Sequence, residues 1–321
     1  MDRVGTFESV LEQATSRRGA VLVGVCNVTP DSFSDGGDHL SMPDALARVD
    51  ALLAEGADMI DVGGESTRPG APPIPASEQL ARVLEVVRYA ARRAPVSIDT
   101  THPEVAEASI EAGACAINDT SCARDERLLR VVSTLKAAYV LMHSRGTQQQ
   151  MRGFSTYPDD AYGDVVVDVL AEWHEAAARA RAAGIPTHAL VMDPGLGFAK
   201  NASHSAELLR RVAELAAGAG VPVMIGASRK SFLKTWDEGA EPKDRLGASV
   251  AAAMLATAAG ARLLRVHDVR ATRQALDVWR SMTPHPPDTE PRLSLAPPAA
   301  PSSEPMLGGD TIRPPERGPD A

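Results

Sequence analysis

Eight short apolar segments recur along this chain, and each of them ends in polar or glycine-containing residues. Each segment is apolar for four to six residues and lacks polar alternation, which is typical of strands buried on both faces of a parallel sheet. Helical patterns separate them, so the sequence predicts an α/β fold, a (β/α)8 TIM barrel, with a doubly wound parallel sheet as the alternative. The segments begin at Val21, Met59, Val96, Ala116, Tyr139, His188, Val221 and Leu263.

The segments between the expected strands carry the start and stop signals of helices. Ser41 is a candidate N-cap, and Gly56 ends the apolar face that follows it. Residues 160–183 show a longer apolar stripe. In residues 245–260, alanine-rich apolar residues cover most faces of the expected helix. We therefore expect this last helix to be internal or packed in a subunit interface.

The composition divides the chain into three parts. Residues 1–20 are an N-terminal lead-in, residues 21–282 contain all eight expected strands, and residues 283–321 carry 11 of the 24 prolines without a hydrophobic period. A segment of this last composition cannot bury enough apolar surface to fold. The sequence therefore predicts a single barrel domain with a disordered, proline-rich C-terminal tail.

The charge of the chain argues against polyanionic partners. With a net charge of -9 and a pI near 5.4, it lacks the excess of positive charge that binds nucleic acid or an anionic membrane. The first 20 residues lack the apolar core of a secretory signal, and no run approaches the ~20 apolar residues that span a bilayer. We expect a cytoplasmic protein.

Several common catalytic signatures are absent from the sequence. It has no GxGxxG fingerprint, no Walker-type lysine loop, no H-x-H or H-E-x-x-H pair and no signature of a Ser or Cys nucleophile. Cys26, Cys115 and Cys122 are too few and too irregular for a disulfide framework or a zinc cluster, so we expect small buried side chains. His143 follows the fifth expected strand and fits a hydrogen-bonded neighbour of a site better than a metal ligand.

Polar residues gather where the expected strands end. In a barrel the C-terminal ends of all strands form one face, and that face carries the active site. Asn27 stands at the end of the first strand, where its neutral amide oxygen suits a hard cation such as Mg²⁺. The loop with Thr67 and Arg68 combines hydroxyls, a guanidinium group and glycines, which suits a mobile anion clamp.

The third, fourth and sixth strands end in side chains that suit a heterocycle. Asp99 and Asn118 have apolar neighbours, and a carboxylate and an amide at a barrel mouth can read the donors and acceptors of a ring edge. Asp193 suits an aminopyrimidine, and Phe198 offers a packing face. Each of these residues also fits a structural role as a cap, a turn residue or a satisfied polar group.

The last two strands end in cations. Lys230 and Ser231 follow the seventh strand beside Arg229, in the region where barrels often hold phosphate. Arg265 and His267 are two residues apart, so in a strand they face the same side and suit a diphosphate. Solvated surface charges are the alternative for Arg229 and Lys230, and a structural role is the alternative for His267. The clustering of all these residues at one face is what favours an enzyme.

Six strings in this chain resemble, in the same order, the motifs of the pterin-binding barrel family, and specifically of the dihydropteroate synthases. The match covers roughly Val21 to Met282. It implies a (β/α)8 barrel that joins a dihydropterin methyl diphosphate to p-aminobenzoate with loss of pyrophosphate, with Mg²⁺ as cofactor, in a homodimer formed through residues 245–260. The strings are NVTPDSFSDGG, DVGGESTRPG, SIDT, DPGLGF, GASRKSF and RVHD.

The resemblance also implies roles for individual residues. Asn27 would bind Mg²⁺ with the diphosphate, and the catalytic residues would be Arg68, Lys230, Arg265 and His267. The pyrophosphate end would be held by Thr67, Arg68, Arg265 and His267, the pterin by Asp99, Asn118, Asp193 and Lys230, and the p-aminobenzoate position by Phe33, Thr67, Pro69, Phe198 and Ser231.

Two rival functions remain within the resemblance. A pterin-binding methyltransferase barrel would share the Asp99, Asn118 and Asp193 edge, but it would not need ESTRPG or SRKSF. A non-catalytic pterin-binding paralogue would not need the cations that hold pyrophosphate. The presence of both features in the sequence favours the synthase.

Overall fold

The computed structural model describes residues 2–29, 42–65, 73–146 and 157–283, and the fold and site are described for these ranges. The predictions for Phe33, Thr67, Arg68 and Pro69 lie outside the described residues, as do those for Ser41 and the proline-rich tail. The residues that remain include every expected strand and most of the expected site.

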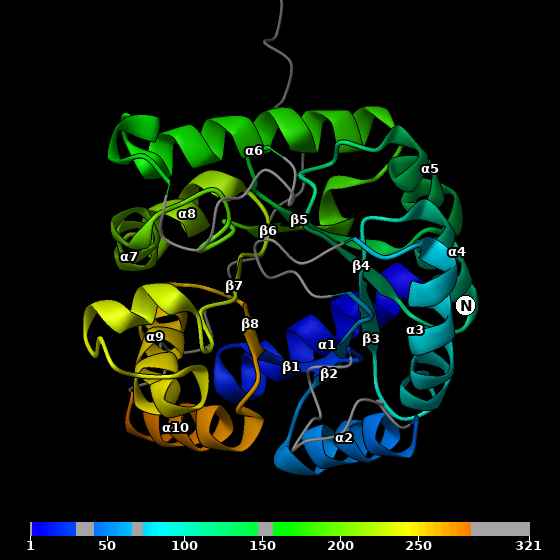
Figure 1. Ribbon diagram of the computed structural model, residues 1–321, viewed down its shortest axis with the longest axis horizontal. Helices are drawn as coiled ribbons and strands as arrows, with labels where there is room; N and C mark the ends of the chain where they lie inside the picture. The colour runs from blue at the N-terminus through cyan, green and yellow to red at the C-terminus, as the bar shows by residue number, and fades with distance from the viewer. Residues whose placement is uncertain (1, 30–41, 66–72, 147–156, 284–321) are drawn as a thin grey trace, which may run out of the picture. The chain divides into compact units, whose positions relative to one another are not determined.

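Eight parallel strands form a nearly closed barrel (Figure 1). They are β1 (Val21–Asn27), β2 (Met59–Gly63), β3 (Val96–Asp99), β4 (Ala116–Asp119), β5 (Ala138–Met142), β6 (Leu190–Asp193), β7 (Met224–Ile225) and β8 (Leu263–Val266). They hydrogen-bond in the order β6-β5-β4-β3-β2-β1-β8-β7, and a parallel bridge between Met192 and Val223 joins the two ends of this order. The predicted TIM barrel is confirmed, and the doubly wound sheet is excluded because such a sheet stays open.

Alternate residues of the strands face two different apolar environments. Val21, Val23 and Leu263 belong to a cluster that fills the lower interior of the barrel, which is the part away from the C-terminal ends of the strands. Leu22 and Leu264, which alternate with them, belong to the larger cluster between the strands and the helices. Because side chains alternate along a strand, both faces must be apolar, which explains the absence of polar alternation in the sequence.

Helices surround the barrel and bury one apolar face each against it (Figure 1). Two 3-10 helices that matter for the site are η5 (Ser231–Thr235) and η6 (Pro242–Arg245). The α-helices that follow β1 in the chain are α2 (Met42–Glu55), α3 (Ala76–Ala91), α4 (Pro103–Glu111), α5 (Glu126–Leu135), α6 (Val165–Ala182), α7 (Ala202–Arg210), α8 (Val212–Ala219), α9 (Leu246–Ala258) and α10 (Val269–Met282).

The N-terminal lead-in contains a helix, α1 (Arg3–Arg18), that the sequence reading did not single out. The Asp2 side chain caps its first turn by accepting a hydrogen bond from the Gly5 backbone N–H. Phe7 and Ala14 pack into the apolar cluster of the lower interior, and α1 contacts β1, β4 and β5. The helix therefore closes the end of the barrel opposite the polar strand ends.

Helix α9 lies on the surface with one apolar side exposed. It packs against α7 and α10 and buries Ala252, Ala253 and Ala256. Leu255 on its other side is 62% exposed and Leu246 is 42% exposed. Of the two expectations for this segment, an internal helix is therefore wrong for the described barrel.

Three further expectations concern the cysteines, His143 and membrane-spanning helices. The three cysteines are buried free thiols, as expected. His143 is fully buried and hydrogen-bonded to Glu172 and Lys200. Among the described residues, none of the helices combines the length and the apolar character that crossing a bilayer demands.

Candidate active site

Strand register places four residues in one layer at the C-terminal end of the barrel. Asn27 of β1 pairs with Gly63 of β2, Gly63 pairs with Asp99 of β3, and Asp99 pairs with Asn118 of β4. A Cβ atom at Gly63 would lie 3.4 Å from Asn27 Oδ1 and 3.5 Å from the Asp99 Cβ. The absent side chain of Gly63 therefore keeps the space between Asn27 and Asp99 open.

Arg265 of β8 reaches across the barrel mouth to two carboxylates. Its Nε donates to Asp61 Oδ2 at 2.7 Å, and one of its Nη groups donates to Asp99 Oδ2 at 2.8 Å. Asp61 is buried below the layer and also accepts from Ser97 Oγ at 2.6 Å. Charge-assisted hydrogen bonds of this kind are strong in a buried setting, so they fix the guanidinium group at the centre of the mouth.

Asn118 has an unused hydrogen-bond acceptor at this mouth. Its Nδ2 is 3.4 Å from Asp61 Oδ2, whereas its buried Oδ1 has no hydrogen-bond partner. Leaving a buried polar atom unpaired costs about 1–3 kcal/mol, so the site gains when a ligand donor pairs with it. The amide and the neighbouring Asp99 thus offer a pair of acceptors to a ring with N–H groups.

Asp193 of β6 faces the same space from the opposite side. A Cβ atom at Gly226 would lie 3.7 Å from the Arg265 Cβ and 4.0 Å from Asp193 Oδ2, which places Asp193 and Arg265 on either side of this glycine. Asp193 Oδ1 accepts from the Gly195 backbone N–H at 2.7 Å. Its charge and those of Arg265 and Lys230 act on one another, so the three groups share one site.

Lys230 lies over the loop that follows β6. Its Nζ donates to the Leu196 carbonyl oxygen, and Nζ lies 4.8 Å from the centroid of the Phe198 ring, a distance typical of a cation–π contact. Lys230 belongs to the motif GASRKSF, whereas Asp193 and Phe198 belong to DPGLGF. The structure brings Lys230, Phe198 and Asp193 together around one short loop.

The ionisable groups of this mouth have shifted pKa values. Burial raises the pKa of Asp99 to about 7, and the charge of Arg265 opposes that shift. Burial lowers the pKa of Lys230 to about 8, and the negative charge of Asp193 opposes that shift. Shifts of this kind, where burial and specific charge partners compete, gather at functional sites.

His267 is held by Ser228 beside Arg265. The Ser228 Oγ accepts the His267 backbone N–H at 3.2 Å and lies 3.1 Å from His267 Nδ1. Burial lowers the pKa of His267 to about 3, with Arg265 and Arg229 adding to the effect, so the imidazole is neutral. We assign the Ser228 hydroxyl as the donor to Nδ1, which leaves the proton on Nε2 as a donor for a ligand.

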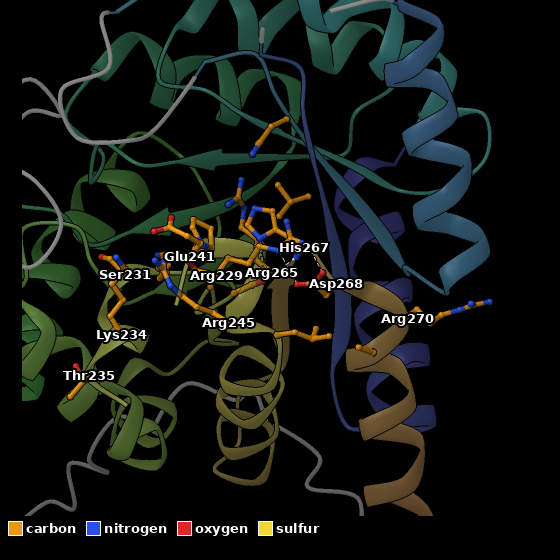
Figure 2. A pocket seen from close by; sticks show the side chains of 18 of the residues that line it. Arg229, Ser231, Lys234, Thr235, Glu241, Arg245, Arg265, His267, Asp268 and Arg270 are labelled. Atoms are coloured by element: carbon orange, nitrogen blue, oxygen red, sulfur yellow. Dashed lines mark hydrogen bonds and ion pairs between the residues drawn. The ribbon is translucent and has the colours of Figure 1, made fainter. Parts of the chain in front are cut away.

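An open cleft of about 1510 Å³ begins at this mouth and extends over η5 and η6. Figure 2 shows Arg265 and His267 side by side on its wall, while Arg270 points away from them. Arg229 is engaged by an ion pair with Asp268. Other lining residues of the cleft are Asn27, Phe198, Lys230 and Ser231.

Comparisons with known proteins agree with this geometry. Residues 23–267 match the family model described as pterin binding enzyme. A dihydropteroate synthase of Mycobacterium leprae is 44% identical over 264 residues, which cover 80% of this chain and 91% of the relative. The chain belongs to the dihydropteroate synthase family.

Solved dihydropteroate synthases share the fold as well as the sequence. The enzyme of Xanthomonas albilineans, solved with 4-aminobenzoic acid, is 42% identical with a TM-score of 0.74, and the match covers 83% of this chain and 94% of that one. The enzyme of Thermus thermophilus in complex with 6HMPPP is 39% identical with a TM-score of 0.69, covering 82% and 94%.

Two residues of this dihydropteroate synthase barrel were missed as parts of the site. Asp61 was given no role in the site, yet it is 1% exposed and bonds to Arg265, Ser97 and Asn118. Its place in the apolar segment MIDVGG is the signal that could have found it, because a carboxylate inside a buried strand needs partners. Ser228 was missed because its contact with His267 joins the segments that follow β7 and β8. No pattern in the sequence indicates this contact.

Ser231 lies at the start of a short helix after β7. It is the first residue of the five-residue 3-10 helix η5, and Lys230 precedes it. Such a helix is too short for a useful macrodipole. Positive charge at this end of the described cleft therefore comes from side chains such as Lys230 and Arg265.

Proposed function

We propose that the chain condenses (7,8-dihydropterin-6-yl)methyl diphosphate with p-aminobenzoate to give 7,8-dihydropteroate and pyrophosphate. One observation carries this proposal. The acceptors Asp99, Asn118 and Asp193 converge on the same mouth as the cations Arg265 and Lys230. A pterin has ring N–H groups to match the acceptors, and its diphosphate matches the cations.

The residues support a dissociative displacement. As the C–O bond to the diphosphate breaks, the pterin ring spreads the positive charge that develops, so the protein has to stabilise the departing pyrophosphate and exclude water. Arg265 and the Nε2 proton of His267 serve the first task. The amine of p-aminobenzoate then attacks the methylene from a position beside Phe198 and Ser231, and no protein nucleophile is needed.

Mg²⁺ is part of the proposal, with Asn27 as its protein ligand. Asn27 presents a neutral oxygen at the rim of the mouth, and the described residues contain no group of three or more His, Cys, Asp or Glu side chains that could cage a metal. A single oxygen fits Mg²⁺, which keeps several waters and binds substrate phosphates. When bound, the ion would neutralise charge on the diphosphate.

The reaction is tested by mixing purified protein with dihydropterin diphosphate, p-aminobenzoate and Mg²⁺. Pyrophosphate and dihydropteroate should appear in equal amounts, and omission of the metal with a chelator present should suppress both. Pyrophosphate without dihydropteroate would mean hydrolysis rather than condensation. Product formation at an unchanged rate without metal would remove Mg²⁺ and Asn27 from the proposal.

Binding of the pterin should depend on pH through Asp99. Since its pKa is raised to about 7, the carboxylate that accepts hydrogen bonds is the minor form below that pH and the major form above it. Affinity for uncharged 6-hydroxymethyl-7,8-dihydropterin should therefore rise with pH, by up to about tenfold per pH unit well below the pKa. Calorimetry measures it, and Asp99→Asn should flatten the curve. A flat curve in the unmodified protein would contradict this role.

We also propose that the chain is a cytoplasmic homodimer in which a second copy covers the exposed apolar side of α9. Leu255 lies at the centre of that side, with the exposed Ala251 and Ala258 next to it. Light scattering at micromolar concentration should give twice the mass of one chain, and Leu255→Glu should shift it to one. A single-chain mass for the unmodified protein would rule the dimer out.

A further inference from the structure

Lys200 is a buried lysine that none of the proposed substrate contacts uses. It ends the string DPGLGFAK, and only 1% of it is exposed. Its Nζ lies 2.9 Å from His143 Nδ1, 3.0 Å from the Phe198 carbonyl oxygen and 3.2 Å from the Gly195 carbonyl oxygen. An ammonium group has three protons. All three are directed to acceptors inside the protein.

The loop that Lys200 holds has an unfavourable backbone. Gly195, Gly197 and Ala199 all have positive φ angles, of 67°, 79° and 49°, and for alanine this left-handed conformation is strained. A Cβ atom at Gly195 would lie 2.1 Å from the His143 carbonyl oxygen, so only glycine fits there. Strained backbone persists only where the surroundings hold it. Lys200 supplies two of the bonds that do so.

This loop carries one proposed pterin ligand, one residue of the proposed p-aminobenzoate position, and the carbonyl that binds Lys230. Asp193 begins it and Phe198 ends it, while the Leu196 carbonyl between them accepts the hydrogen bond from Lys230. The two carbonyls that Lys200 bonds belong to Gly195 and Phe198, on either side of Leu196. A shift of these carbonyls would move all three groups.

His143 connects this lysine to the helix layer. Burial lowers the pKa of His143 to about 4, and Lys200 adds to the effect, so the imidazole is neutral. Its Nδ1 then accepts from Lys200, and its Nε2 donates to Glu172 Oε2 at 3.0 Å. Glu172 lies on α6 and also pairs with Arg145. The loop is thereby tied to an outer helix of the barrel.

Packing alone does not explain a lysine at this position. Burial lowers the pKa of Lys200 to about 7, with Asp193 opposing it, because removing an ammonium group from water is costly. An apolar side chain of similar length, such as methionine, would fill the space without that cost. What methionine cannot do is orient two loop carbonyls and an imidazole.

We propose that Lys200, acting with His143, is a positioning residue that holds the loop of Asp193 and Phe198, and with it Lys230, in the geometry that binds pterin. This inference rests on the proposed function, because it assumes that the loop borders the pterin. Lys200 itself touches no substrate.

The test compares Lys200→Met with Lys243→Met, a control at an exposed lysine of η6. In Lys200→Met the Kd of 6-hydroxymethyl-7,8-dihydropterin, measured by calorimetry, should rise at least about tenfold, since small misplacements of positioning groups have large effects. The KM for the pterin diphosphate should rise with it. A merely structural lysine would lower the Tm and the fraction of binding-competent protein, but not the affinity of the folded fraction.

A second pair of variants keeps the inference testable if Lys200→Met does not fold. Glutamine in His143→Gln can accept from Lys200 and donate to Glu172, whereas leucine in His143→Leu can do neither. Pterin affinity should fall in His143→Leu and largely recover in His143→Gln. A Kd within about twofold of the unmodified protein, in folded Lys200→Met or in His143→Leu, would overturn the role. Loss of condensation in the unmodified protein would instead reject the proposed function and leave this comparison of affinities intact.

Discussion

Arg265→Ala should lower kcat/KM by at least about 100-fold, the scale for losing a preorganised charge stabiliser. Arg265 is the group that Asp61 and Asp99 fix at the centre of the mouth. Alanine removes the charge that we propose meets the leaving pyrophosphate, and it also leaves two buried carboxylates without their cation. Steady-state kinetics with both substrates measures the loss, and thermal unfolding shows how much of it comes from a weaker fold.

Arg262→Ala is the matched control for that experiment. Arg262 is an exposed arginine just before β8, at the opposite end of the strand from the mouth. Its replacement should leave the rate unchanged. A rate for Arg265→Ala close to that of Arg262→Ala, in folded protein, would reject the role of Arg265 in turnover.

Lys230→Ala should have an effect of similar size, at least about 100-fold on turnover. Its positive charge interacts with the negative charge of Asp193. It also contacts the Leu196 carbonyl and the Phe198 ring, where we propose that pterin and p-aminobenzoate meet. Alanine would remove the charge and the contact with the Phe198 ring. We expect a higher KM for the pterin diphosphate together with a lower kcat.

Lys243→Ala serves as the comparison for Lys230→Ala, because Lys243 is exposed on η6. Circular dichroism should show that both variants keep their helix content. Full activity in Lys230→Ala would show that its charge is dispensable and would leave its contact with Leu196 as a structural feature only.

The fold was largely predictable from the sequence, because strands buried on both faces leave a clear pattern. All eight expected segments became strands, down to the two residues of β7. Helix α1 was missed although Phe7, Leu11 and Ala14 have helical spacing, since most of this segment is polar and its partners lie in distant strands. Local sequence patterns predict which side of a helix or strand is apolar, but not which distant element packs against that side.

The same limit applies to the site. Asn27, Asp99, Asn118 and Arg265 could be placed at one face because each follows an apolar segment. The pairing of Arg265 with Asp61 could not be predicted, since Asp61 lies 204 positions away in the chain. Bonds of this kind depend on strand order and register, which emerge only when the barrel closes.

A crystal structure with dihydropterin diphosphate and Mg²⁺ bound tests the convergence of these groups most directly. The pterin ring should lie within hydrogen-bonding distance of Asp99, Asn118 and Asp193, with its phosphates toward Arg265 and His267. A ring bound elsewhere, with the Asn118 amide oxygen still unpaired, would contradict the proposed site.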